Sequence, residues 1–147
     1  MRRATLLALV SVAVTALAAC GGGSGGGGGS GDLQQEAAQV SALLDRIEAL
    51  PTTATTDQEF TQQLGQIRAQ VQVEIEDVAD ADAPEELESE RDKLSNRLRS
   101  LRTSLGRVQG LAAGGDVESA KTAMGQLLSV GEIRDTIEII EGSSSSG

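Results

Sequence analysis

The sequence predicts an all-α fold, an antiparallel up-down bundle of about four helices that follows a signal peptide and a flexible Gly/Ser tether. Strand formers are few, because Phe60 is the only aromatic residue and the chain has no Trp, Tyr or His. From residue 32 to residue 142, apolar residues recur three and four positions apart, as on one face of a helix. Leu, Ile, Val and Phe supply 28 of these 111 residues. This share exceeds the level of roughly 20% typical of disordered chains, so the stretch can fold as one small domain.

The first helix is expected to begin at Asp32, which can cap its N-terminus. It is expected to stop at Pro51, because proline lacks the backbone N–H that a helix interior needs. Its apolar stripe consists of Leu33, Ala37, Val40, Leu44 and Ile47.

A capping box predicts the start of the second helix, with Thr56 as the N-cap and Glu59 three residues later. The two side chains of such a box each accept a hydrogen bond from a backbone N–H that the helix leaves unpaired. The stripe of this helix consists of Phe60, Leu64, Ile67, Val71, Ile75 and Val78.

Pro84 is expected in the first turn of a third helix, where the negative charges of Glu85 and Glu86 interact favourably with the helix dipole. Gly114 and Gly115 stop this helix, and Asp116 caps a fourth, which has a predicted break at Val130–Gly131. The third stripe is Leu87, Leu94, Leu98, Leu101, Leu105 and Val108, and the fourth is Val117, Ala120, Met124, Leu127, Ile133, Ile137 and Ile140.

Short connections between these helices favour antiparallel neighbours, hence a single bundle. The alternative is a pair of coiled-coil hairpins that close their seam against another chain, which includes a homo-oligomer. Phe60 and Met124 stand at helical spacing and are expected in the core rather than in a ligand site.

The N-terminus has the layout of a secretory signal. Arg2 and Arg3 precede a stretch from Ala4 to Ala19 that carries no charge and is shorter than the roughly 20 apolar residues of a membrane span. Its last residues, Leu17-Ala18-Ala19-Cys20, resemble the lipobox of bacterial lipoproteins. That resemblance implies cleavage before Cys20 and a diacylglyceryl thioether on its sulfur, with acyl chains such as palmitate.

Cys20 is the only cysteine, so it has no disulfide partner, and lipidation explains an unpaired thiol in an exported protein. Two acyl chains anchor stably, whereas one binds membranes only marginally. The alternative is an ordinary signal peptide with a chance cysteine. The expected organisation is a signal peptide at 1–19, a lipidated Cys20 with its linker at 20–31, the bundle at 32–142 and a disordered tail at 143–147.

The linker from Gly21 to Gly31 contains only glycine and serine, which keep a chain flexible, with a root-mean-square span of about 18 Å. It does not match a phosphate-binding loop, because no Gly-Lys-Ser/Thr follows it. The predicted location is therefore the extracytoplasmic face of a cell membrane, with the folded part close to the surface.

A second resemblance covers residues 83–130. Ala83-Pro84-Glu85-Glu86-Leu87, an Arg-rich heptad helix and the restart around Gly115-Asp116 are similar to small helical lipoproteins of actinobacteria. Most of those proteins have no assigned activity, and helix caps explain most of the shared motif.

Charge and composition exclude several functions. Without residues 1–19 the chain has ten basic and 22 acidic side chains, a net charge of −12, which argues against nucleic acid as a partner. Without histidine, and with Cys20 committed to lipid, the usual nucleophile–base pairs are missing. A pair of glutamates could in principle hydrolyse glycosides, but sugar sites ordinarily use aromatic platforms. The chain is expected not to be an enzyme and to need no cofactor.

Ten carboxylates lie between Glu74 and Asp92, around the predicted turn between the second and third helices, and Arg91 is the only basic residue among them. We call this segment the acidic turn. Its simplest interpretation is a solvated, solubilising surface. Alternatives are a basic protein partner or a low-affinity Ca²⁺ or Mg²⁺ site. The metal candidates are Asp80, Asp82, Glu85 and Glu86, and the arginines Arg97, Arg99, Arg102 and Arg107 are expected to be solvated and to compensate the helix dipole.

The predicted function is that of a membrane-anchored, non-enzymatic scaffold or interaction module that contacts another envelope protein. The alternative is a lipoprotein that carries a divalent cation or a small ligand, either on the acidic turn or inside the bundle. A partner role predicts a surface groove, and a carrier role predicts stabilisation by the ligand.

Overall fold

The computed structural model describes residues 30–143, with side chains from Leu33 onward. The predicted signal peptide, Cys20 and nearly all of the linker lie outside the described residues, as do the last four residues of the predicted tail. The described part consists of helices and connections without a strand, which confirms the all-α fold class. The elements are α1 (Ser30–Thr53), α2 (Asp57–Asp80), the 3₁₀ helix η1 (Glu85–Leu87), α3 (Glu88–Ala113), α4 (Val117–Gly125) and α5 (Leu128–Ser143).

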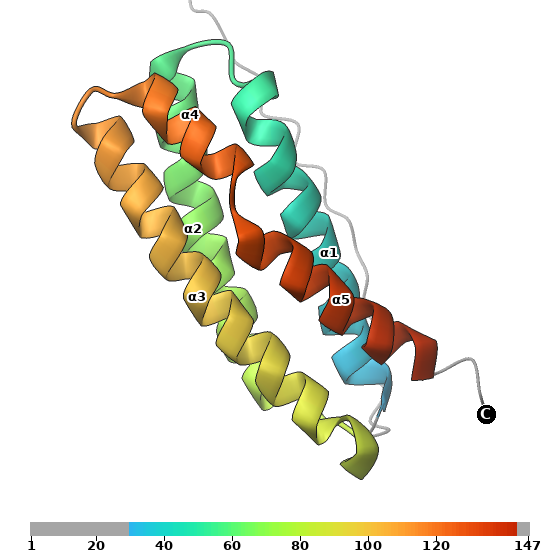
Figure 1. Ribbon diagram of the computed structural model, residues 1–147. Coiled ribbons are helices and arrows are strands. Elements are labelled where there is room, and N and C mark those ends of the chain that lie inside the picture. Colours follow the sequence, from blue (N-terminus) through green and yellow to red (C-terminus); the bar gives the residue numbers. More distant parts are fainter. Residues whose placement is uncertain (1–29, 144–147) are drawn as a thin grey trace, which may run out of the picture.

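The helices form an antiparallel up-down bundle, in which α4 and α5 together return along α1 and α3 (Figure 1). The beginning of α1, the α2–α3 turn and the end of α5 lie at one end, which we call the linker end (Figure 1). The α1–α2 and α3–α4 turns lie at the other, which we call the far end (Figure 1). None of the helices between residues 30 and 143 has an apolar stretch long enough to cross a bilayer.

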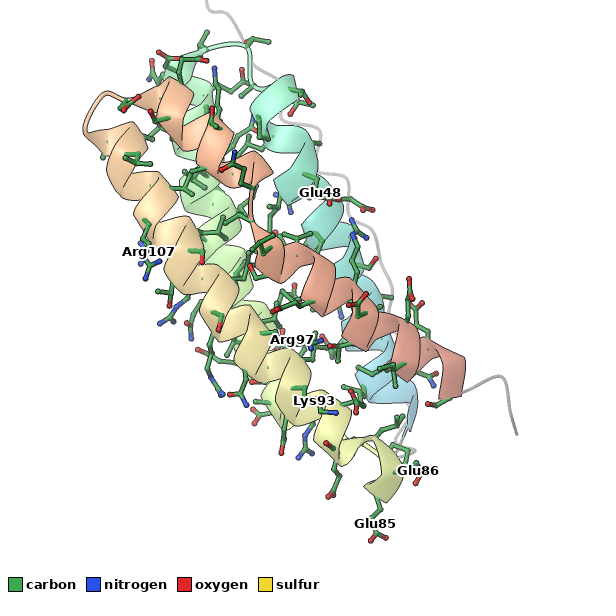
Figure 2. All side chains as sticks on the ribbon, in the orientation of Figure 1. Glu48, Glu85, Glu86, Lys93, Arg97 and Arg107 are labelled. Carbon is green, nitrogen blue, oxygen red and sulfur yellow. The ribbon has the colours of Figure 1, made fainter. Side chains whose placement is uncertain are left out.

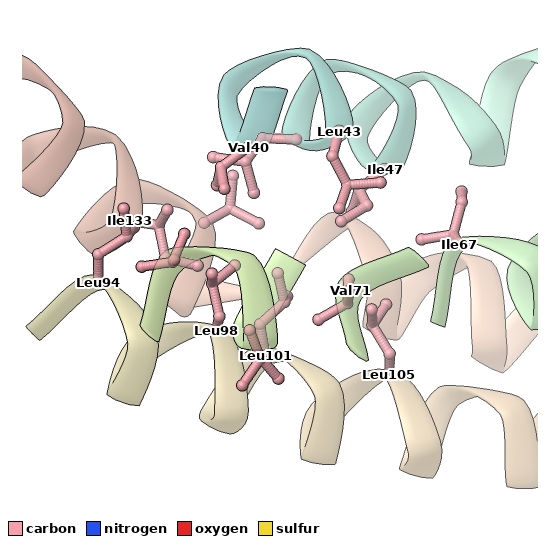
Figure 3. Packing of buried hydrophobic residues seen from close by; sticks show 14 of the residues in the cluster. Val40, Leu43, Ile47, Ile67, Val71, Leu94, Leu98, Leu101, Leu105 and Ile133 are labelled. Carbon is pink, nitrogen blue, oxygen red and sulfur yellow. The ribbon is translucent and has the colours of Figure 1, made fainter. Parts of the chain in front are cut away.

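The core runs along the axis of the bundle, where side chains from the helices interdigitate (Figure 3). Every residue of the predicted stripes is buried except Leu127, which is partly buried against the core. Phe60 is fully buried and Met124 is 3% exposed, as the helical spacing predicts. Leu43 and Leu50 widen the stripe of α1, because this helix contacts α2 on one side and α4 and α5 on the other.

Pro51 does not stop the first helix, contrary to the prediction, since α1 continues to Thr53. A proline in the last turn removes one backbone hydrogen bond without displacing the rest of the helix. The hydroxyls of Thr52 and Thr53 both donate to the carbonyl oxygen of Ala49, at 2.9 and 3.0 Å, and so hydrogen-bond with the final turn.

The second helix begins as predicted, with the Thr56 hydroxyl accepting the Glu59 backbone N–H at 3.1 Å. The other hydrogen bond of the capping box, which the Glu59 side chain accepts, differs from the prediction by one residue. The Glu59 carboxylate accepts the backbone N–H and the hydroxyl of Thr55, at 2.9 and 2.7 Å, rather than the N–H of the N-cap. These bonds, the Thr55 hydroxyl first, lower the pKa of Glu59.

The next helices begin and end close to the predicted signals. Pro84 precedes η1 rather than lying in α3, and its carbonyl accepts the N–H groups of Leu87 and Glu88 at 2.8 and 3.1 Å. Gly115 has a φ of 86°, a conformation that favours glycine, and Asp116 accepts the N–H of Ser119 at 3.1 Å.

The predicted break at Val130–Gly131 is wrong. The interruption falls at Gln126 and Leu127. Their backbone N–H groups donate to the carbonyl oxygens three residues earlier in the chain, at 3.3 Å each. Gly131 stays inside α5, because the neighbouring residues Val130 and Ile133 are anchored in the core.

Candidate functional site

The four residues proposed from sequence as metal ligands, Asp80, Asp82, Glu85 and Glu86, are all exposed at the linker end. Figure 2 shows Glu85 and Glu86 at the tip of this end, directed away from the helices. Within residues 33–143, the carboxylates that converge are a different set.

That set joins α1 to α2. Glu36 on α1 and Glu74 and Asp77 on α2 each place a carboxylate oxygen within 4.8 Å of the others. We call these three residues the carboxylate cluster. Glu36 lies in the second turn of α1 and Asp77 in the last turn of α2, so the cluster sits toward the linker end of the bundle.

Glu74 is the unusual member, since its side chain is only 4% exposed. The sequence places Glu74 in the solvated acidic turn, and the structure corrects this. Its Oε2 atom is buried and has no hydrogen-bond partner among the described residues. Burial raises the pKa of the Glu74 carboxyl, and the nearby charges of Glu36 and Asp77 raise it further.

The polar surroundings of Glu74 offset its burial only in part. Gln70, one turn earlier on α2, lies within hydrogen-bonding reach of the Glu74 carboxyl and lowers its pKa. The Gln70 side-chain oxygen accepts a hydrogen bond from the Arg46 guanidinium on α1. Glu36 accepts from the Gln39 amide at 3.1 Å. Neither Glu74 nor Asp77 forms an ion pair with an arginine or lysine among the described residues.

The sequence does contain the signal that Glu74 is buried. It lies three residues after Val71 and four before Val78, so it occupies the apolar stripe of α2 at helical spacing. The approach of Glu36 carries no such signal, because it depends on the register of α1 against α2.

Arg97 departs from the expectation that the arginines of α3 are solvated. Its guanidinium is directed from α3 toward α5 (Figure 2), where it donates to the Glu132 carbonyl and the Thr136 hydroxyl. The other three are exposed as predicted: Arg99, Arg102 and Arg107. A cross-helix ion pair joins Arg134 of α5 to Asp45 and Glu48 of α1, at 2.8 and 2.5 Å.

The far end carries an open surface depression. Asp57 and Thr61 of α2 line one side, and Ala113 and Val117, on either side of the α3–α4 turn, line the other. Lys121 lies beside it, with its Nζ 3.7 Å from Asp57 and 5.9 Å from the centre of the Phe60 ring. We call this feature the far-end depression.

The fold and these features together define a small helical bundle with an apolar interior, a partly buried acidic cluster and a polar surface. Comparisons with protein-family models, curated proteins and solved structures found no match for the chain.

Proposed function

We propose that this chain is a lipid-anchored, extracytoplasmic helical module that binds another envelope protein through its surface. The lipobox residues Leu17–Cys20 support the anchor, and the Gly/Ser linker supports a bundle held near the membrane. The protein is proposed to act as a scaffold or modulator rather than as an enzyme.

The observation that carries the proposal is the placement of the far-end depression. The linker joins the bundle where α1 begins, whereas the residues that line the depression belong to the start of α2 and the α3–α4 turn. These two segments lie at the opposite end of the bundle (Figure 1). A tether on one end leaves the other end directed away from the membrane, where a partner can reach it. A partner role predicts such a surface groove.

The filled interior favours surface recognition over a ligand carried inside the bundle. Large apolar side chains from α1, α2, α3 and α5 meet along the axis and are almost fully buried (Figure 3). A small ligand between the helices would have to displace core side chains. Substitutions that disturb a packed core to this extent cost several kcal/mol, so ligand entry would carry a similar cost.

Site-specific cross-linking in the native cell tests the partner role. A photo-reactive residue at Gln62, which lines the far-end depression, is expected to form a discrete adduct with another envelope protein. The matched control is the same residue at Glu138, which is exposed on α5. Equal adducts from both positions, or none from Gln62, would contradict recognition at the far end.

Metabolic lipid labelling tests the anchor separately. Because Cys20 is the only thiol, Cys20→Ala is expected to leave an unprocessed precursor without thioether-linked lipid. Ser24→Ala, in the linker, is the control and is expected to be labelled normally. Equal labelling of the Cys20→Ala variant would end the lipoprotein hypothesis.

A further inference from the structure

We propose that Glu36, Glu74 and Asp77 form a low-affinity Ca²⁺ site that joins α1 to α2. Two independent observations support this site: the three carboxylate oxygens converge within 4.8 Å, and Glu74 Oε2 is buried without a hydrogen-bond partner. The proposal concerns the folded part alone and does not depend on the lipid anchor or on a protein partner.

The electrostatics of the carboxylate cluster favour a bound cation. Three carboxylates at this spacing repel one another, and Glu74 additionally loses most of its hydration at 4% exposure. Arg46 reaches Gln70 rather than the cluster itself. A divalent cation would satisfy the unpartnered oxygen of Glu74 and remove the repulsion in a single step.

The ligand set favours Ca²⁺ over Mg²⁺. Ca²⁺ takes oxygen ligands at about 2.4 Å in a flexible geometry, so oxygens up to about 4.8 Å apart can share one ion. The three carboxylate oxygens of the cluster lie within that distance of one another. Mg²⁺ demands a near-ideal octahedron at about 2.1 Å, to which three carboxylates held on two packed helices adapt less readily.

The affinity is expected to be low. Three carboxylates from two helices leave several coordination positions to water, and no loop wraps around the ion. Extracellular Ca²⁺ modules of this kind have dissociation constants on the order of 10⁻⁴ to 10⁻³ M. Such a site would be filled where Ca²⁺ is millimolar, as outside a cell, and empty inside one.

The consequence for the fold is a clamp between the first two helices. Glu36 comes from the turns of α1 that follow the linker, and the other two ligands come from the last turns of α2. A bound ion would therefore fasten the beginning of α1 to the bundle, at the point where the linker enters.

Thermal unfolding of the full chain in non-ionic detergent, followed by circular dichroism, tests the site with Ca²⁺ as the probe. At tenfold the dissociation constant, Ca²⁺ is expected to raise the Tm by roughly 4–8 °C. This rise should disappear in Glu74→Gln and in Asp77→Asn. NaCl at matched ionic strength provides the control for screening.

Asp82→Asn and Glu85→Gln provide the matched controls, because each removes one charge from the exposed acidic turn. Both should keep the full Ca²⁺ response. A retained response in Glu74→Gln, its loss in Asp82→Asn, or an equal response to NaCl would each overturn the site. A Mg²⁺ response as large as that to Ca²⁺ would overturn the choice of ion.

Equilibrium dialysis with radioactive Ca²⁺ measures binding without reference to stability. One ion per chain is expected at millimolar concentration, with at least a tenfold weaker affinity in Glu74→Gln. Absence of binding to the unsubstituted chain would refute the proposal while leaving the lipid anchor and the partner role intact. A failed cross-linking or lipid-labelling experiment would likewise leave the Ca²⁺ site standing.

Discussion

The guanidinium of Arg97 on α3 donates a hydrogen bond to the hydroxyl of Thr136 on α5, a residue whose exposed fraction is 0%. The same hydroxyl donates to the Glu132 carbonyl at 3.1 Å, and Arg97 donates to that carbonyl as well. Three groups from two helices therefore form a small polar network at the edge of the core. It fixes α5 against α3.

Thr136→Val is predicted to lower the free energy of unfolding by about 1–2 kcal/mol, because it keeps the side-chain shape and removes the hydroxyl. Chemical denaturation measures this loss. Thr103→Val is the control, since the Thr103 hydroxyl bonds only the Arg99 carbonyl of its own helix and is exposed. Equal losses in the two variants would show that the contact between α3 and α5 contributes nothing specific.

Glu74→Gln is predicted to stabilise the chain at neutral pH by about 1 kcal/mol, measured in the presence of a chelator. The pKa of Glu74 is raised in the folded state, first by burial and then by Glu36 and Asp77. Below the unfolded pKa the carboxyl is protonated in both states and costs nothing. As pH rises through the folded pKa, the buried group must ionise, so stability falls.

The unsubstituted chain and Glu74→Gln should therefore differ at neutral pH and converge in acid, in denaturation curves taken across pH. The groups facing Glu74 are Glu36 from α1 and Asp77 and Gln70 from α2, with Arg46 reaching Gln70. Asp82→Asn, on the exposed turn, should not reproduce the pH dependence of Glu74→Gln. A Glu74→Gln variant that is less stable than the original at neutral pH would contradict the repulsion argument.

Leu98→Asp and Leu101→Asp are each predicted to lower the free energy of unfolding by several kcal/mol, because a charge replaces a side chain with 0% exposure. Figure 3 places both leucines at the centre of the packing. Leu128→Asp is the matched control on a leucine that is 86% exposed, and it should change stability little. Tolerance of a charge at Leu98 or Leu101 would be incompatible with this core.

The acidic turn is predicted to face the membrane in the anchored protein, because it shares an end with the start of α1 (Figure 1). The linker spans about 18 Å, which is two to three Debye lengths at physiological salt. At low ionic strength, anionic headgroups should repel the acidic turn and keep the domain away from the bilayer. Millimolar Ca²⁺ should bring the domain closer to the bilayer.

Fluorescence transfer to labelled anionic bilayers, from labels near Asp82 and near Gly114, measures this orientation in protein anchored through Cys20. The label near Asp82 should lie closer to the bilayer and respond to salt and Ca²⁺. A label near Gly114 that lies closer, or transfer insensitive to both salt and Ca²⁺, would rule the orientation out.

The sequence by itself determined the helices and their buried faces, because these depend on local spacing and local caps. Thr56, Asp116 and Gly115 act on backbone groups within a few residues of themselves, so their roles can be predicted from the sequence. The continuation of α1 through Pro51 and of α5 through Gly131 was not predicted. A proline in the last turn of a helix removes only one backbone hydrogen bond, and core packing on either side of Gly131 outweighs the modest helix penalty of a glycine.

Only the tertiary structure decided which polar side chains meet. Glu74 could have been placed on the apolar stripe of α2, but its approach to Glu36 depends on how far α1 slides and rotates against α2. The bond from Arg97 to Thr136 likewise depends on the register of α5 against α3. Helical periodicity specifies which face of a helix is buried. The register between two such faces is set by the fit of the whole core, which no single segment of the sequence contains.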